Sequence, residues 1–207
     1  MVNAASKRPS HDERRRLILE AASDIFFEQG YSATSIDAII ERAGGSKRNI
    51  YTEFGSKEGL FTAIVTSNAD IALSSLSLEE TSGRSLHDTL ISFGQRLMKI
   101  YMTSTVVAVY RIAVTEASRF PDLARSLYDQ GPGRAASQLA EVLVRARDRG
   151  DVKVDDCAGA AGHFVAMLRD NTHLQVVLGL REPPSDEEIS RIVTSAVDVF
   201  LNGIRAR

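Results

Sequence analysis

The chain has 207 residues, of which 43% are hydrophobic and 25% charged, and its net charge is -2. This composition excludes a chain that is disordered throughout, and the single cysteine excludes a fold held together by disulfides. No run of 18 uninterrupted apolar residues is present, and residues 1–16 are polar and basic, unlike a signal peptide. We therefore expect a cytoplasmic protein that does not act at a membrane.

Helical periodicity begins near the N-terminus. Apolar residues recur three and four positions apart over 11–29, and the same pattern returns in two short segments over 35–42 and 47–54. A fourth helix is predicted to begin near residue 56. Serine or threonine precedes each of these segments, as an N-cap requires, and glycine follows the first three.

The second part of the chain is predicted to contain longer helices. The polar stretch 77–85 separates it from the first part, and helices are expected over 86–103, 106–118, 121–130, 133–149, 155–180 and 185–204. No alternating strand pattern is found, so the fold class is all-α. We expect a flexible basic arm over 1–10, a first domain over 11–76 and a larger second domain over 77–207.

The two short helices have the pattern of a helix-turn-helix. They are joined by Gly44-Gly45 and braced by the longer first helix, and in this motif the second short helix enters the DNA major groove. Ile50 and Phe54 would bury one side of that helix. Arginine can bind guanine and asparagine can bind adenine through two hydrogen bonds. The side chains predicted to face DNA are Ser46, Lys47, Arg48, Asn49, Tyr51 and Thr52.

The distribution of charge supports DNA binding only in two short segments of the first part of the chain. Residues 42–57 and residues 7–16 each carry a net charge of +3, whereas residues 1–70 contain nine basic and ten acidic residues. The first domain must therefore present one basic face rather than a generally basic surface. A solvated helix surface is the alternative interpretation of these charges.

The motifs GYSATSI (30–36), SKRNIY (46–51) and FGSKEGLF (54–61) follow one another at gap-free spacing. This region resembles the DNA-binding domain of TetR-type transcriptional regulators. The resemblance implies phosphate contacts from Thr34 or Ser35 and from Lys57. Two residues depart from the family pattern: Gly45 stands where an apolar residue is usual, and Glu53 where histidine or tyrosine is common.

Residues 119–132 are similar to the AefR-like group of TetR C-terminal domains. That resemblance implies a homodimer in which each chain contributes two helices to a four-helix bundle, and apolar stripes on the last two helices fit this role. Packing into the chain's own core is the alternative. The predicted interface residues are Phe164, Leu168, Gln175, Ile192, Val193, Ala196 and Phe200.

The family also implies a small effector bound among the middle helices of the second domain. Aromatic, methionine and isolated polar side chains suit such a pocket, although an ordinary core has the same composition. The candidates are Phe93, Leu97, Tyr101, Met102, Tyr110, Met167 and Asn171. No cofactor or metal site is expected, because His163 and His173 do not share a helix face, and Cys157 is interpreted as a small buried side chain.

The sequence therefore predicts a homodimeric DNA-binding repressor that a small effector releases from a palindromic operator. No catalytic motif is found, and no catalytic residue is assigned. The alternatives are an all-helical enzyme or an interaction protein that does not bind DNA. The operator, the effector, the regulated genes and the sign of regulation do not follow from the sequence.

Overall fold

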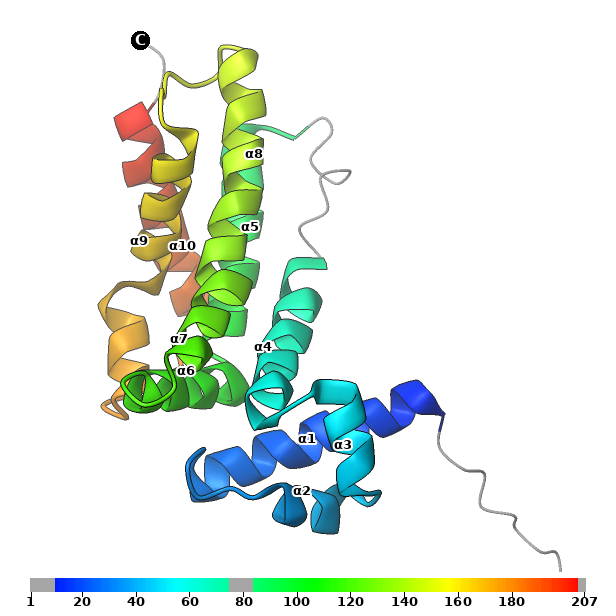
Figure 1. The fold of residues 1–207 in the computed structure, drawn as a ribbon. Coiled ribbons are helices and arrows are strands. Elements are labelled where there is room, and N and C mark those ends of the chain that lie inside the picture. The colour runs from blue at the N-terminus through cyan, green and yellow to red at the C-terminus, as the bar shows by residue number, and fades with distance from the viewer. Residues whose placement is uncertain (1–9, 75–83, 205–207) are drawn as a thin grey trace, which may run out of the picture. The chain divides into compact units, whose positions relative to one another are not determined.

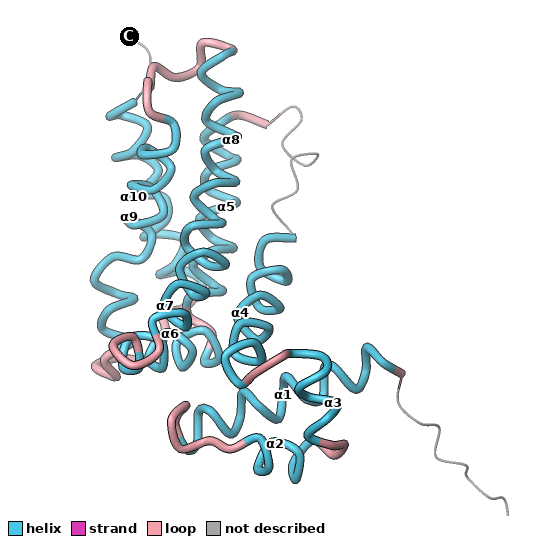
Figure 2. The backbone as a smooth tube through the Cα atoms, viewed as in Figure 1, coloured by secondary structure: helices cyan, strands magenta, loops and turns pink. Residues whose placement is uncertain are grey.

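The computed structural model describes residues 10–74 and 84–204, and in these ranges helices are joined by short loops with no β-strand (Figure 2). The predicted all-α class is thereby confirmed. The chain divides into two compact units, residues 1–64 and 65–207. The division falls inside one helix, whereas the predicted boundary at residue 77 lies outside the described residues, as does nearly all of the predicted arm.

The first unit contains three helices and the beginning of a fourth. These are α1 (His11–Gln29), α2 (Ile36–Ala43), α3 (Lys47–Phe54) and the first part of α4 (Lys57–Ser74). The bounds of α1 and α3 are those predicted from the sequence, and α2 starts one residue later.

Serine side chains fix where the helices of this unit begin. The hydroxyl oxygens of Ser10, Ser35 and Ser46 each accept a hydrogen bond from the backbone N–H three residues later, at 3.1–3.3 Å. Each bond satisfies a backbone donor that has no partner within the helix. The turn between α2 and α3 needs its two glycines, because Gly44 and Gly45 have φ angles of 75° and 105°.

An aromatic cluster forms the core of the first unit. The rings of Phe26, Tyr31 and Phe61 lie 5.2–6.1 Å apart, and all three side chains are buried. Ile39 of α2 and Ile50 of α3 are also buried. Each short helix is therefore anchored through its apolar side, which leaves its other side free for solvent or a ligand.

The second unit contains the end of α4 and the remaining helices. Their bounds are α5 (Leu86–Tyr101), α6 (Ser104–Glu116), α7 (Pro121–Tyr128), α8 (Arg134–Asp148), α9 (Cys157–Val177) and α10 (Asp186–Ile204). Within this unit α5, α8, α9 and α10 lie side by side, and α6 crosses near one end of them (Figure 1). Gly94 lets α5 approach α10 closely, because a Cβ there would lie 2.7 Å from a methyl group of Val193.

Three local features differ from the prediction. The expected break at Gly131-Pro132 is instead a π-helical turn, Asp129–Gly133, which joins α7 to α8. Helix α9 is interrupted at Asp170, whose backbone is not helical. Ser185 and Glu188 have the spacing typical of a capping box at the start of α10, but only half of the box forms: Ser185 accepts from the backbone N–H of Glu188, whereas the carboxylate of Glu188 accepts from Arg181 at 2.7 Å.

Among the described helices, none by itself is long and apolar enough to cross a membrane. Helices α5 and α6, which meet at a bend of 69°, reach that length and composition only as a pair.

Candidate functional site

Helix α3 exposes the residues that were predicted to meet DNA. Ile50 is buried at 1% exposure, whereas Ser46, Lys47, Arg48, Asn49 and Thr52 are exposed and Tyr51 is 50% exposed. The oxygen of Ser46 caps the helix, but its O–H remains a donor. One face of α3 therefore anchors the helix while its first turn presents hydrogen-bonding groups.

The charges around α3 are arranged unevenly. The ammonium of Lys47 pairs with Asp37 of α2 at 2.8 Å, and the hydrogen bond from this pair raises the pKa of Lys47. Arg48 makes no ion pair within the part of the chain that the structure describes. Glu53, which the sequence suggested as a negative charge near DNA, lies 3.3 Å from the guanidinium of Arg15 and is 19% exposed. That carboxylate is thus compensated from α1.

The side chain of Thr34, one of the two candidates for the phosphate contact near the start of α2, is buried. It is 3% exposed, and its hydroxyl lies 2.8 Å from the carbonyl of Gly30, to which it donates. Ser35, the other candidate at this position, is exposed at the N-terminus of α2. An O–H donor at a helix N-terminus suits an anion, so the predicted phosphate contact stays with Ser35.

Lys57, for which the resemblance implies a phosphate contact, is held by groups of the first unit. Its ammonium donates to the carbonyl oxygens of Tyr31 and Thr34 at 2.8 and 3.0 Å, and it lies 4.5 Å from the centre of the Tyr31 ring. The side chain is half-buried. These contacts turn the ammonium inward, toward the loop between α1 and α2, so a structural role for Lys57 stands beside the predicted phosphate contact.

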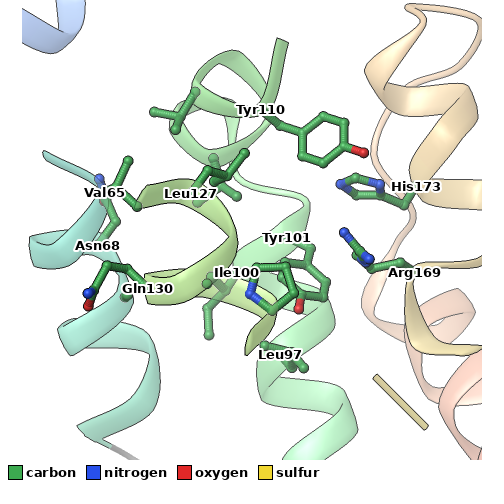
Figure 3. Close-up of a pocket in the computed structure, with 15 residues that line it drawn as sticks. Val65, Asn68, Leu97, Ile100, Tyr101, Tyr110, Leu127, Gln130, Arg169 and His173 are labelled. Atoms are coloured by element: carbon green, nitrogen blue, oxygen red, sulfur yellow. The ribbon is translucent and has the colours of Figure 1, made fainter. Parts of the chain in front are cut away.

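The second unit encloses a small cavity of about 60 Å³ among its middle helices (Figure 3). Three of the seven predicted pocket residues, Leu97, Tyr101 and Tyr110, line it. The other lining residues are Val65, Asn68, Ala69, Ile100, Val106, Val109, Leu127, Gln130, Gly131, Pro132, Arg169 and His173.

Four predicted pocket residues do not line this cavity. Phe93 and Met102 are buried in the core at 5% exposure, with Phe93 packed against Phe164. Met167 packs on the edge of the same core. Asn171 is exposed on α9, just after the interruption of that helix, so the structure places these four residues outside the lining of this cavity.

Two residues that sequence reasoning did not assign to the pocket, Arg169 and His173, point toward the cavity from α9 (Figure 3). The ring of His173 meets Tyr110 edge-on at 5.1 Å and Tyr101 at 5.8 Å. A spacing of four residues places two side chains on one face of an unbroken helix, but α9 is interrupted at Asp170 between them, so the sequence contains no signal for this pair. Burial, and then the charge of Arg169, lower the pKa of His173 to about 4, so its imidazole is neutral at pH 7.

Family models match most of the chain. Residues 18–64 match the TetR family of bacterial regulatory proteins, and residues 88–203 match the C-terminal domain of AefR-like transcriptional repressors. The chain belongs to the TetR family. It is a helix-turn-helix transcriptional regulator, and the prediction that it is not an enzyme is confirmed.

Relatives of this TetR-family regulator include proteins of known structure. The flavonoid-responsive regulator FrrA is 33% identical over 95% of this chain and 99% of its own, with a TM-score of 0.79. A TetR-family regulator from Mesorhizobium loti is 26% identical over 96% of this chain and all of its own, with a TM-score of 0.82. The transcriptional activator FasR of Mycolicibacterium smegmatis is 41% identical over 68 residues, and this match spans 33% of the chain and 31% of FasR.

Most of the predicted interface residues of this regulator face its own core instead. Phe164, Leu168 and Val193 have no exposed surface, and Ala196 and Phe200 are 8% and 7% exposed. These five side chains are covered by their own chain, which is the alternative that the sequence left open for the apolar stripes of the last two helices. Of the seven, Gln175 is exposed and Ile192 half-buried.

The outer surfaces of α9 and α10 carry exposed apolar side chains. Leu174 and Leu178 of α9 are 52% and 61% exposed, and Val199 of α10 is 61% exposed. The apolar pattern of these helices is thus divided between an inner stripe that forms the core and an outer set of single residues. Periodicity alone does not distinguish the two.

Proposed function

We propose that this regulator is a homodimeric repressor that binds a palindromic operator through α3 and is released when a small ligand occupies the cavity of the second unit. The observation that carries the proposal is the surface of α3. Its first turn is exposed and contains Arg48 without an ion pair in the described residues, while Ile50 anchors the helix. Its place of action would be the bacterial cytoplasm, where the operator DNA lies.

Repression is favoured over activation by the second part of the chain. That part matches AefR-like repressors over residues 88–203, whereas the match to the activator FasR covers 68 residues. Small-molecule release is supported by the cavity and by the relative FrrA, which is described as flavonoid-responsive.

Dimerisation is supported by the exposed apolar residues of α9 and α10. Leu174, Leu178 and Val199 would be removed from water if these helices met their copies across a twofold axis. Gln175 and Ile192 remain available to the same interface. Two α3 helices related by that axis would read two operator half-sites about one DNA turn apart.

Helix α4 provides a physical connection between ligand and DNA. It begins at Lys57 in the first unit, and Val65, Asn68 and Ala69 of the same helix line the cavity. A ligand that contacts these residues can favour one position of α4 over another. It can release the operator only to the extent that it binds the released conformation more tightly.

The experiment starts with selection of bound duplexes from a random pool, followed by affinity measurements on the selected operator over a range of salt concentrations. Arg48→Ala should weaken binding by about 1–3 kcal/mol and relax the preference at one base pair. Arg145→Ala, which removes the same charge from an exposed position of α8, is the matched control and should leave affinity unchanged. Equal operator affinity in the wild type and Arg48→Ala would refute the assignment, and absence of salt-dependent binding to any duplex would refute the proposed function.

A further inference from the structure

Among the described residues that line the cavity of the second unit, one is positively charged and none is negatively charged. Arg169 is the charged residue at neutral pH among those that line it, and no aspartate or glutamate does so. His173 beside it is neutral because burial keeps its pKa at about 4. The neighbouring Asp170 is exposed, and its carboxylate accepts from the backbone N–H of Thr172 at 2.6 Å. It does not pair with Arg169.

Two polar atoms at this cavity lack partners within the described parts of the chain. They are the buried Nε of Arg169 and the buried hydroxyl oxygen of Tyr101. The guanidinium of Arg169 lies 6.0 Å from the centre of the Tyr101 ring, so the two side chains lie close together at the cavity. Buried donors without acceptors are costly and uncommon in native proteins. A ligand with acceptor oxygens would satisfy both.

The remaining walls suit an apolar body. Leu97, Ile100, Val106, Val109 and Leu127 provide aliphatic contacts. The edge-on arrangement of His173 with Tyr101 and Tyr110 adds aromatic surface beside them. A ligand that fills the cavity would therefore carry its charge at one end and a compact hydrocarbon portion at the other.

We propose that the cavity binds a small carboxylate with a compact apolar or aromatic body, whose carboxylate pairs with Arg169 and accepts a hydrogen bond from the Tyr101 hydroxyl. This inference rests on the proposed function, in which the cavity is the effector site. A guanidinium matches a carboxylate through two parallel hydrogen bonds. A neutral ligand would leave Arg169 without a counter-ion, and a cationic one would be repelled by it.

The test compares carboxylates with their neutral amides on the full-length protein. Two pairs of probes, propionate with propionamide and benzoate with benzamide, are titrated by calorimetry at pH 7 into the wild type, Arg169→Met and Tyr101→Phe. Arg145→Met is the control, because it removes an exposed arginine away from the cavity. Methionine keeps most of the arginine stem, so packing is largely preserved.

In the wild type and the control, at least one carboxylate should bind about ten- to a hundredfold more tightly than its amide, as expected for hydrogen bonds to a charged group. Arg169→Met should abolish this difference, and Tyr101→Phe should reduce it. Arg169→Met should also melt at the same or a higher temperature without ligand, because an unpaired cation has been removed. That result shows that the variant is folded.

Two results would overturn the proposal. One is that neither carboxylate binds more tightly than its amide, and the other is that the preference survives in Arg169→Met. Operator affinity without any ligand, measured on the same samples, separates this inference from the proposed function. Intact salt-dependent operator binding with no preference for carboxylates refutes only the ligand class, whereas loss of operator binding in the wild type refutes the function itself.

Discussion

Lys57 can act as a structural cation within the first unit or as a phosphate contact, and its replacement by methionine distinguishes these two roles. The ammonium donates to two carbonyl oxygens, those of Tyr31 and Thr34, and lies over the Tyr31 ring. Methionine retains an apolar stem but removes the charge and its donors. If Lys57 is a structural cation, the variant should destabilise the first unit; if it is a phosphate contact, only DNA binding should suffer.

The size of the effect follows from these contacts. A hydrogen bond to a charged group contributes about 1.5–3 kcal/mol, and a cation over an aromatic ring contributes about 0.5–1 kcal/mol at a partly exposed site. Lys57 is half-buried, so water can replace part of what is lost at the two carbonyls. We therefore expect the first unit of Lys57→Met to lose about 2–4 kcal/mol of its free energy of unfolding.

Amide hydrogen exchange measured on peptides is the appropriate assay. The chain contains two compact units, so a single global melting curve does not report on one of them. Peptides from α1, α2 and α3 should lose about thirty- to a thousandfold of their protection, while those from α5–α10 stay unchanged. Lys47→Met is the control, because its ammonium makes one exposed ion pair, with Asp37, and little protection should be lost.

One pattern would refute the structural role of Lys57. Protection in Lys57→Met would equal that of the wild type, while the salt dependence of operator binding would fall by about one unit. Such a result would support the role that the family resemblance implies for Lys57, a phosphate contact.

Three further predictions concern other parts of the chain. The pKa of His173 is about 4 in the folded chain and 6.5 in the unfolded chain. The free energy of unfolding should therefore be at its full value above pH 6.5 and should fall by about 3 kcal/mol as the pH drops to 4, because the unfolded chain takes up the proton first. His173→Gln should flatten this pH dependence in denaturation curves. Gly45→Val should cost the first unit about 1–2 kcal/mol, because φ is 105° there although no atom blocks a Cβ, whereas Gly162→Ala in open space on α9 should not destabilise the second unit; amide hydrogen exchange of peptides from each unit compares them. Val199→Glu should give monomers in sedimentation velocity, because it places a charge in the proposed apolar interface. The control is Val114→Glu, which should remain dimeric: Val114 is 59% exposed and Val199 is 61% exposed, but Val114 lies on α6, outside that interface. A dimeric Val199→Glu would place the interface elsewhere.

Short-range sequence patterns specify the helices of the DNA-binding unit. Their starts depend on serine side chains three residues from the N–H groups they cap, and the turn depends on the backbone freedom of Gly44 and Gly45. The exposed first turn of α3 follows from the same short-range pattern, since Ile50 fixes which side of the helix is buried. All these interactions join residues close in sequence, so they can be recognised without a fold.

Which polar residues turn inward depends instead on how the helices pack against one another. The sequence left Thr34 and Ser35 equivalent, and the packing of α1 against the following loop buries Thr34. It suggested Lys57 as a surface charge, whereas two backbone carbonyls more than 20 residues away hold its ammonium. The approach of the Arg169 guanidinium on α9 to the Tyr101 ring on α5 likewise joins two separate helices. Such contacts depend on how separate helices pack, and an apolar stripe on one helix does not specify which neighbour will cover it.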